Sequence, residues 1–380
     1  MPRHPDVSST VTAMRGGVFS ALAHRFASLS GEIYPFHVGD TWMEPPPGAR
    51  MQDLSVEEFP GMHRYVEPQG YGPLLDAVGA LRGVGRDRLL IAAGATGGLF
   101  SVAGAILDPG DEVLILAPYW PLIRGIVTAA RGVAVDVPFF DRQGSVDELL
   151  RPYLSARTVA LYVNTPNNPT GRVLDAEIMA EIAAFADRHG LWILSDEVYE
   201  RYSFGKPHVS AAAFAPERTF VAHSFSKAYG MAGNRVGYVV GPSAESMLQA
   251  RKISTNSFYA APTAAQIAAL RAMERGDAWL DAARARYREL AEASADALGL
   301  PRPEGGTFLF LDVADLLDDR GVQGFLEDCL EDRLLLAPGA SFGAPYATWV
   351  RLCYTATPPD VTARGVALLA DRLRRARERA

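Results

Sequence analysis

Cysteine is scarce in this sequence of 380 residues, with only Cys329 and Cys353 present. Two cysteines are too few for a disulfide framework or for a cysteine-ligated zinc site. The seven histidines show no HxxxH or other paired spacing typical of metal ligands, so we expect no metal centre. A reducing, cytoplasmic setting is the default expectation for such a chain.

Long apolar runs and a surplus of positive charge are also missing. No apolar stretch approaches the ~20 residues of a membrane helix, and the N-terminal segment MPRHPDVSSTVTAMRGG has no apolar core of the signal-peptide type. The formal net charge of −7 disfavours a nucleic-acid partner, because phosphate binding needs Lys and Arg concentrated on one face. Hydrophobic residues make up 48% and charged residues 21%, an ordinary globular balance.

The middle of the chain alternates short β-branched apolar runs with longer helical stretches. Several runs are apolar on both faces, which is typical of buried parallel strands. The alternation predicts an α/β fold with a mostly parallel, seven-stranded sheet between two layers of helices. The predicted strands are RLLIAAG, DEVLILAP, VAVDVPFF, TVALYVNTP, LWILSDEV, TFVAHSFS and RVGYVVG, and the predicted helices between them include Thr96–Ile106, Leu122–Arg131 and Asp175–His189.

The length of the chain favours a large domain plus a smaller one, because a single hydrophobic core seldom serves so many residues. We place the large domain at residues 48–270. The Ala- and Arg-rich stretch Ala272–Leu298 has helical periodicity and is expected to lead out of the sheet domain. The segments GTFLFLDV, LLLAPGASFG and WVRLCYT, with two helices, then predict a smaller α+β domain formed by residues 1–47 and 271–380.

The strongest chemical signal is a lysine surrounded by small residues, in the stretch SFSKAYGMAGNRVGY. Lys227 directly follows an apolar strand, and a desolvated amine has a lowered pKa and forms Schiff bases with aldehydes. Ser224 and Arg235 flank it with a hydroxyl and a guanidinium suited to phosphate. A lone lysine at a strand end is more often a surface residue, but these neighbours argue against that alternative.

Three other predicted strands also end in residues that could bind a ligand or take part in a reaction. Ligands commonly bind at such strand ends in α/β sheets. The turn NTPNNPTG follows one strand, SDEVY ends another, and GATGG joins a strand to a helix whose N-terminus can face an anion. Each has a simpler alternative: turn chemistry, a helix N-cap at Asp196, or a glycine turn without a ligand. Trp120, after a fourth strand, is an ordinary packing residue if it does not face a ligand.

Taken together, these stretches resemble the class I/II aminotransferases, which belong to fold-type I of the pyridoxal-phosphate enzymes. The GAT, NNPTG, DEVY and lysine motifs follow one another in the family's order, and the resemblance extends from FHVGD to VRL near Arg351. It implies pyridoxal 5'-phosphate as cofactor and a homodimer with active sites at the subunit interface. One departure is that the region after Tyr71, GPLLDAVGALRGVG, is shorter than usual and lacks the family's arginine at position 75 or 76.

The resemblance also implies a role for each motif residue. Lys227 would hold the cofactor as a Schiff base and later carry a proton, while Asp196 would keep the pyridine nitrogen protonated so that the ring accepts electrons. Asn168 and Tyr199 would bond the phenolic oxygen, and Trp120 would stack on the ring. The phosphate contacts would be Gly94, Ala95, Thr96, Ser224, Arg235 and, from the neighbouring subunit, Tyr65.

On the substrate side, the resemblance implies that Arg351 grips the α-carboxylate, near Asn168 and the backbone of Val38 and Gly39. An arginine inside an apolar strand needs a partner, and a buried salt bridge to a protein carboxylate is the alternative explanation. An L-amino acid with an apolar or aromatic side chain is the expected donor, because Trp42, Trp120, Tyr119 and Phe258 are expected near the site.

The reaction implied is transamination in two half-reactions, from an amino acid to the cofactor and then to a 2-oxo acid. A lyase, cyclase or decarboxylase of the same fold type is the nearest rival, because the same lysine, aspartate and arginine serve all of them. A non-catalytic, cofactor-binding regulatory module is a further alternative. The segment around Arg15–Gly17 matches nothing familiar, and it leaves the substrate open.

Overall fold

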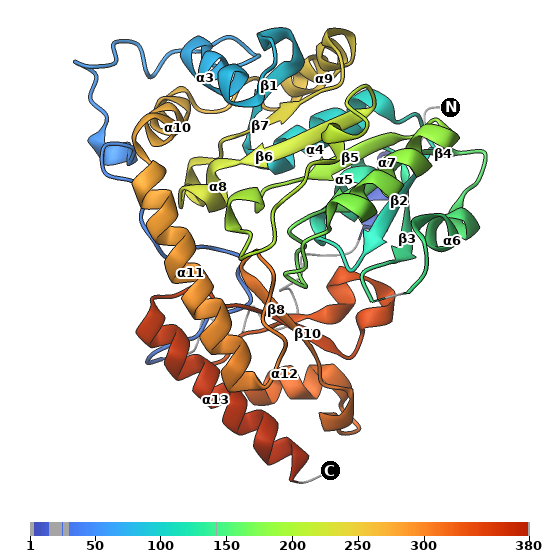
Figure 1. The fold of residues 1–380 in the computed structure, drawn as a ribbon, viewed down its shortest axis with the longest axis vertical. Coiled ribbons are helices and arrows are strands. Elements are labelled where there is room, and N and C mark those ends of the chain that lie inside the picture. Colours follow the sequence, from blue (N-terminus) through green and yellow to red (C-terminus); the bar gives the residue numbers. More distant parts are fainter. Residues whose placement is uncertain (1–3, 15–24, 26–29, 142, 379–380) are drawn as a thin grey trace.

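A computed structural model of the chain describes residues 4–14, 25, 30–141 and 143–378 and is built around two sheets (Figure 1). The strands of the large sheet are β1 (Leu89–Ala92), β2 (Glu112–Ala117), β3 (Val133–Pro138), β4 (Thr158–Asn164), β5 (Trp192–Asp196), β6 (Thr219–Ser224) and β7 (Gly237–Val240). Their order is β1-β7-β6-β5-β4-β2-β3, and only β7 runs antiparallel to its neighbours. The predicted seven-stranded, mostly parallel sheet is confirmed.

Helices cover both faces of this sheet. The face that we call the α4 face packs against α4 (Gly94–Ile106), α5 (Leu122–Ala129) and α9 (Ala244–Ser257). The opposite α3 face packs against α3 (Gly72–Arg82), α6 (Val146–Leu150), α7 (Ala176–His189) and α10 (Thr263–Arg275). Every residue of β2 is buried, which explains why residues 113–117 of this strand form a continuous apolar run rather than an alternating one.

Local sequence signals set the helix ends, as α7 illustrates. The Asp175 side chain accepts a hydrogen bond from the Ile178 backbone N–H at 3.0 Å and so caps the helix N-terminus. Gly190 ends the helix in the left-handed region with φ of 66°. The predicted helix Asp175–His189 is therefore confirmed, with its first residue serving as the cap.

A smaller antiparallel sheet lies beside the large one, with strand order β8-β10-β9. It consists of β8 (Phe308–Asp312), β9 (Ala337–Pro338) and β10 (Trp349–Cys353), accompanied by α12 (Gly321–Glu331) and α13 (Pro359–Arg377). The long helix α11 (Asp277–Leu298) runs toward this part of the molecule and packs along α13 (Figure 1). The domain limits at residues 47 and 270 stay predictions.

The connector to the smaller sheet is divided, and the sequence-based expectation of one helix from Ala272 is wrong at its start. Ala272 belongs to α10, and Gly276 separates that helix from α11. Glycine is a poor helix former because it loses the most backbone freedom on ordering, so a break at this position is physically reasonable.

Both cysteines are free and buried in the structure. In the described part of the chain, no helix is long and apolar enough to cross a membrane. The cytoplasmic setting itself stays a prediction.

Candidate active site

A pocket of about 430 Å³ lies at the carboxyl ends of β4, β5 and β6, beside the start of α4. Its volume suits a small-molecule ligand, and its place is where open α/β sheets bind ligands. It brings together most of the predicted site residues from segments far apart in the sequence. The predicted residues that line it are Gly39, Ala95, Thr96, Trp120, Asn168, Asp196, Tyr199, Ser224, Lys227, Arg235 and Arg351.

A larger groove of about 810 Å³ lies elsewhere, between residues 200–208 and α11. It is open, and its charged side chains are largely paired with one another, as in the Arg288–Glu292 contact of 2.7 Å. The smaller pocket holds the converging chemical groups, so we identify it as the candidate site.

Lys227 is half-buried in the pocket wall on the short helix α8 (Phe225–Ala228). Burial lowers the pKa of its ammonium group below the ordinary value, although the charge of Asp40 acts in the opposite direction. Its Nζ donates a hydrogen bond to the backbone carbonyl of Gly39, on the loop before the large domain. A lysine so placed is chemically suited to act as a nucleophile and a base.

Asp196 ends β5 with its carboxylate facing the pocket. It is 3% exposed, and burial raises its pKa to about 6, although the hydrogen bond from the Tyr162 hydroxyl at 2.7 Å acts in the opposite direction. The helix N-cap alternative does not hold, because the next short helix begins at Glu200 and its N-cap is Tyr199. The site therefore contains a buried carboxylate with no cation paired to it in the described chain.

Arg351 lies in β10 and is only 5% exposed. Its guanidinium donates to the Asn168 side-chain oxygen at 3.0 Å and to the His37 carbonyl at 2.6 Å, and its Nε has no partner. It lies over the ring of Phe308, 4.2 Å from the ring centroid. Burial lowers the pKa of Arg351 to about 10.

The salt-bridge alternative for Arg351 finds no support in the structure. Among the described residues no carboxylate lies within ion-pair distance of its guanidinium, and its partners are neutral oxygens. A buried cation without a counter-charge is costly, so an anionic ligand is the physical explanation for its place in the wall of a pocket.

Asn168 and Tyr199 complete the wall between Asp196 and Arg351. The Asn168 backbone N–H donates to the side chain of Asn164 at 2.7 Å, which holds the NNPTG turn against the end of β4. Tyr199 is buried edge-on against the ring of Phe308, with 5.7 Å between centroids. Burial raises its pKa above the ordinary value.

The start of α4 forms the other end of the pocket, where Ala95 and Thr96 bring the N-terminus of a 13-residue helix to the wall. Gly94, at the first position of this helix, has φ of 68° and lies against Arg235. A Cβ atom at Gly94 would lie 2.6 Å from a guanidinium nitrogen of Arg235. Helix amides and an arginine kept clear of side chains form a cradle suited to phosphate.

On the other side of the pocket, Gly39 has no room for a side chain. A Cβ atom there would lie 2.9 Å from the ring of Phe308 and 3.9 Å from a guanidinium nitrogen of Arg351. The backbone of this loop thus lies directly beside the arginine, as the resemblance implies.

Some sequence expectations do not fit the pocket. Of the four aromatic residues expected near the site, only Trp120 lines it, whereas Trp42, Tyr119 and Phe258 do not. Tyr119 is fully buried, and its hydroxyl donates to Asp136 at 2.9 Å, because its side chain packs into the core. Tyr65, expected at the phosphate of the neighbouring subunit rather than of its own, lies outside this pocket and is 88% exposed, and its role stays a prediction.

Sequence reasoning missed several residues of the site. Tyr162 supports Asp196 from β4, and Asn164 donates to the backbone carbonyl of Asp196 at 2.9 Å. Tyr162 and Asn164 are two residues apart in β4, so their side chains point to the same face. This spacing could have identified Tyr162 from the sequence. Ser226, Leu122 and Val198 also line the pocket, without a sequence pattern that distinguishes them.

The residues present fit pyridoxal phosphate: an anion cradle at α4, an unpaired buried carboxylate and a lysine converge on one pocket. Comparison with known proteins agrees with this fit. A family model described as aminotransferase class I and II matches residues 32–368. The chain belongs to the class I and II aminotransferase family. This aminotransferase is a pyridoxal-phosphate enzyme of fold-type I that transfers amino groups between amino acids and 2-oxo acids.

Relatives of the aminotransferase cover most of its length. The aspartate/prephenate aminotransferase of Thermus thermophilus is 33% identical over 317 residues, 79% of this chain and 81% of that protein. The arginine–pyruvate transaminase of Pseudomonas aeruginosa is 32% identical over 308 residues, 76% of each. The structure of the Thermus thermophilus aspartate aminotransferase with maleate superposes with a TM-score of 0.87 at 29% identity, covering 97% of this chain and 100% of that one.

Proposed function

We propose that Lys227, Asp196 and Tyr199 form the catalytic centre of this aminotransferase and that Arg351 binds the α-carboxylate of its substrates. The observation that carries the proposal is the buried Arg351 guanidinium, which shares a pocket with Lys227 and has no carboxylate partner in the described chain. A substrate carboxylate would supply the missing charge and the second acceptor of a bidentate contact.

Pyridoxal phosphate, when bound, supplies a carbonyl that reacts with amines and a ring that takes up electron density from the substrate's Cα–H bond. The Asp196 carboxylate would face the ring nitrogen and hold a proton there. The Asn168 amide and the Tyr199 hydroxyl would bond the phenolic oxygen, and the Trp120 indole would cover the ring. The phosphate would lie against Gly94, Ala95, Thr96, Ser224 and Arg235.

Lys227 is the proposed base that takes the proton from Cα and later returns it. Its lowered pKa favours the neutral amine needed for this step. The hydrogen bond from Nζ to the Gly39 carbonyl places the amine beside the loop that also contacts Arg351 through His37. The amine is therefore held next to the proposed carboxylate site.

For the donor, we propose an L-amino acid with an apolar or aromatic side chain. Beyond the residues assigned above, the described pocket wall is formed largely by apolar groups such as Leu122 and Val198. The nearby Arg124 is already paired with Asp136, which also accepts from Tyr119. The names of the two relatives imply an acidic and a basic donor, so family membership alone leaves the side chain open.

The first test locates the reactive lysine. The purified holoenzyme would be reduced with borohydride, digested and mapped by mass spectrometry. We expect one pyridoxyl group on Lys227, and none in the Lys227→Ala variant. A label on another lysine, or no label, would overturn the proposed centre.

The second test identifies the reaction and the donor. Half-reactions with a panel of L-amino acids would be followed through the absorption of the bound cofactor. We expect the pyridoxamine form to accumulate, fastest with apolar or aromatic donors. Release of ammonia or CO₂ would indicate a lyase or decarboxylase, and a preference for aspartate or arginine would contradict the proposed donor class.

We further propose that the enzyme is a homodimer in which Tyr65 reaches the phosphate of the partner subunit. Tyr65 is 88% exposed, lies outside the pocket of its own chain, and packs against Tyr259 in a tilted arrangement with 5.0 Å between ring centroids. An exposed pair of aromatic rings is typical of a surface that another molecule covers.

Mixed dimers test this arrangement directly. Tyr65→Ala and Lys227→Ala variants would each be weakly active or inactive as homodimers. In a mixed dimer, one site would combine the intact Lys227 of one chain with the intact Tyr65 of the other. Recovery of activity on mixing supports a shared site, whereas no recovery in a verified mixed dimer contradicts it.

A further inference from the structure

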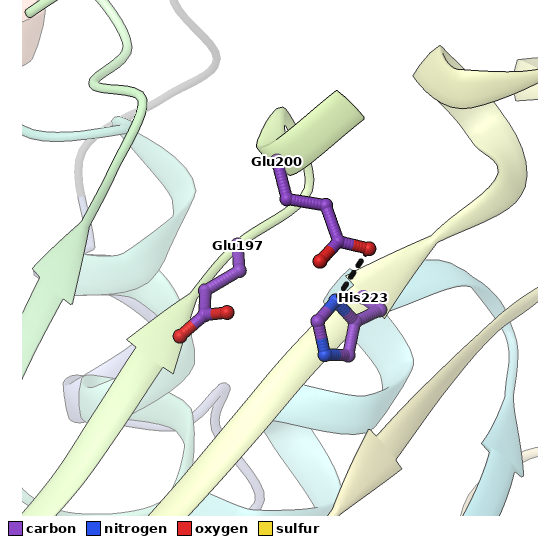
Figure 2. Close-up of side chains that lie close together, drawn as sticks. All are labelled: Glu197, Glu200 and His223. Carbon is purple, nitrogen blue, oxygen red and sulfur yellow. Dashed lines mark ion pairs between the residues drawn. The ribbon is translucent and has the colours of Figure 1, made fainter. Parts of the chain in front are cut away.

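A second group of ionisable side chains, Glu197, Glu200 and His223, lies close together near the carboxyl ends of β5 and β6 (Figure 2). Asp196 and Ala222 are register partners, so Asp196 and Ser224 point to one face. Glu197 and His223, one residue further along, point to the α3 face because strand side chains alternate. Together with Glu200 and Arg82 they form what we call the α3-face cluster.

The α3-face cluster is an ion-pair network. Glu197, Glu200 and His223 offer ligand atoms within 4.8 Å of one another, a spacing that a metal ion could also use. However, Arg82 from the end of α3 already supplies a cation to Glu200, with one contact at 3.0 Å and a second, shorter one. Glu197 accepts from His208 at 2.9 Å and from two serine hydroxyls, so its charge is also compensated.

His223 is the centre of this network. Its side chain is 5% exposed, and its Nδ1 lies 3.2 Å from an Arg82 nitrogen and 3.4 Å from a Glu200 oxygen. Arginine only donates hydrogen bonds and a carboxylate only accepts them. Nδ1 therefore has a partner in either state: it accepts from Arg82 when unprotonated and donates to Glu200 when protonated.

The network joins the two segments that carry the proposed catalytic groups. Glu200 directly follows Tyr199 on the turn after β5, and the Glu197 backbone N–H donates to the Ala222 carbonyl at 2.9 Å. His223 precedes Ser224 and lies four residues before Lys227. Across the strand pair, the His223 ring packs on Tyr238 with 4.8 Å between centroids, and Arg82 also donates to the Tyr238 hydroxyl at 2.6 Å.

We propose that His223 is a positioning residue, which fixes the turn carrying Asp196 and Tyr199 relative to the strand end carrying Ser224 and Lys227. The proposal rests on the roles proposed above for these four residues. A neighbouring cavity of about 20 Å³, lined by His223, Glu197 and Glu200, has room for about one water molecule. The imidazole is covalently part of one of the two segments, whereas a water molecule in this cavity would be part of neither. A water molecule would therefore not hold the two segments together as the imidazole does.

Proton transfer depends on this kind of alignment, since small misplacements of a catalytic group cost large factors in rate. Arg351, the proposed substrate-binding residue, lies on β10 and is not part of the network. Loss of His223 should therefore lower kcat and leave KM for the amino donor nearly unchanged. A general loss of folding would instead lower the fraction of enzyme that holds cofactor.

The test compares His223→Phe with His223→Asn in the holoenzyme, with rates normalised to bound cofactor. Phenylalanine keeps a ring but offers no hydrogen bond, so we expect kcat to fall on the order of tenfold with KM within about twofold. Asparagine can accept from Arg82 and donate to Glu200, so it should restore kcat to within about threefold of the natural enzyme. The Glu112→Gln variant is the matched control, because Glu112 is buried and paired with Arg157 at the amino-terminal end of β2, whereas the network lies at the carboxyl ends of the strands.

An unchanged kcat in His223→Phe, an equal loss in His223→Asn or in Glu112→Gln, or a change confined to KM would overturn the proposal. If His223→Phe does not accumulate as holoenzyme, Glu200→Gln removes the charge that faces the imidazole and keeps the side-chain size. A natural-level kcat in Glu200→Gln would then overturn it. The borohydride test on the unmodified enzyme shows separately whether the proposed centre itself is correct.

Discussion

Two neighbouring carboxylates, Asp196 and Glu197, lie on opposite faces at one strand end. Their pKa values are shifted in opposite directions. Both are almost fully buried. Burial raises the pKa of Asp196 to about 6, and the Tyr162 hydroxyl only partly offsets it. Burial would raise the pKa of Glu197 too, but the hydrogen bond from His208 and the charge of His223 outweigh it, and its pKa is lowered.

The difference separates a binding face from a structural face. On the pocket side, Asp196 and Arg351 have neutral partners, so their charges are available to a ligand. On the α3 side, Glu197 and Glu200 meet histidine and arginine within the chain. Functional sites commonly sacrifice stability in this way, because groups arranged for a ligand are unsatisfied without it.

The largest effect should come from removing the amine on the pocket face. Lys227→Ala should lower kcat about 10⁴-fold, because no other described lysine lines the pocket to move the proton. Initial rates with an amino acid and a 2-oxo acid would measure it. Lys252→Ala, on an exposed helix surface, is the control and should keep full activity. Comparable activity in both variants would contradict the assignment.

The second prediction contrasts the half-buried Arg82 with the buried Arg351 in the free energy of unfolding. Arg82→Met should destabilise the protein by about 2–4 kcal/mol, because the largely buried Glu200 loses its nearest cation and keeps only the longer contacts to His223 at 3.4 Å and Arg201 at 3.9 Å. Arg351→Met should cost less than about 1 kcal/mol, because no carboxylate loses a partner, yet it should raise KM for the amino donor on the order of 100-fold.

Urea unfolding of the two variants as apoenzymes, beside steady-state kinetics of the holoenzymes, checks both effects. Equal destabilisation by the two substitutions would break the distinction between the faces. An unchanged KM in Arg351→Met would remove the arginine from the substrate site.

The two faces also differed in how far sequence could predict them. The pocket residues lie in short motifs at strand ends, so Lys227, Asp196 and Asn168 could be identified from local patterns. Strand runs such as DEVLILAP were equally local, because burial on both faces leaves a continuous apolar run. Such signals require no knowledge of which strands are neighbours.

The α3-face cluster could not be predicted in this way. Arg82 lies 118 residues from Glu200 and 141 from His223, and each residue alone resembles an ordinary surface or core residue. Their meeting depends on the strand order, which places β6 between β5 and β7. The carbonyls of His37 and Gly39 contact Arg351 and Lys227 from a distant loop, and only the family resemblance, not a local pattern, placed this loop near Arg351. Non-local contacts of this kind leave no local pattern.

The third prediction concerns the pH dependence of apoenzyme stability. Because the folded pKa of Asp196 is raised from 3.8 to about 6, the folded state binds its proton more tightly than the unfolded state. Ionisation therefore costs stability as pH rises from about 4 to about 6, and the penalty of about 3 kcal/mol is complete above that. Asp196→Asn, which does not ionise, should be more stable than the natural apoenzyme at pH 8 and lose this advantage near pH 4.

Glu197→Gln is the matched comparison, with the opposite sign. Its folded pKa is lowered, so the ionised carboxylate contributes stability above its unfolded pKa of 4.5 and loses it as pH falls. This variant should be less stable than the natural apoenzyme at pH 8, and the gap should narrow in acid. Thermal unfolding midpoints of the three apoenzymes across this range would measure both curves. If the unfolding midpoints of both variants shift in the same direction from those of the natural apoenzyme as pH changes, the opposite pKa shifts of Asp196 and Glu197 are contradicted.

The smallest effect concerns the anion cradle, where the room left by Gly94 allows Arg235 to occupy its position. Gly94→Ala would place a methyl group 2.6 Å from the Arg235 guanidinium, so the arginine must move from the proposed phosphate position. We expect cofactor affinity to fall on the order of tenfold, about 1.4 kcal/mol, in a titration of the apoenzyme. Gly83→Ala is a close control, because Gly83 has nearly the same φ, 66° against 68°, and nothing lies within 4 Å of its added Cβ. Both alanines would bear the strain of a left-handed φ. A loss of affinity confined to Gly94→Ala therefore reports the occupied space beside Arg235, whereas equal losses would reduce the cradle to a matter of backbone conformation.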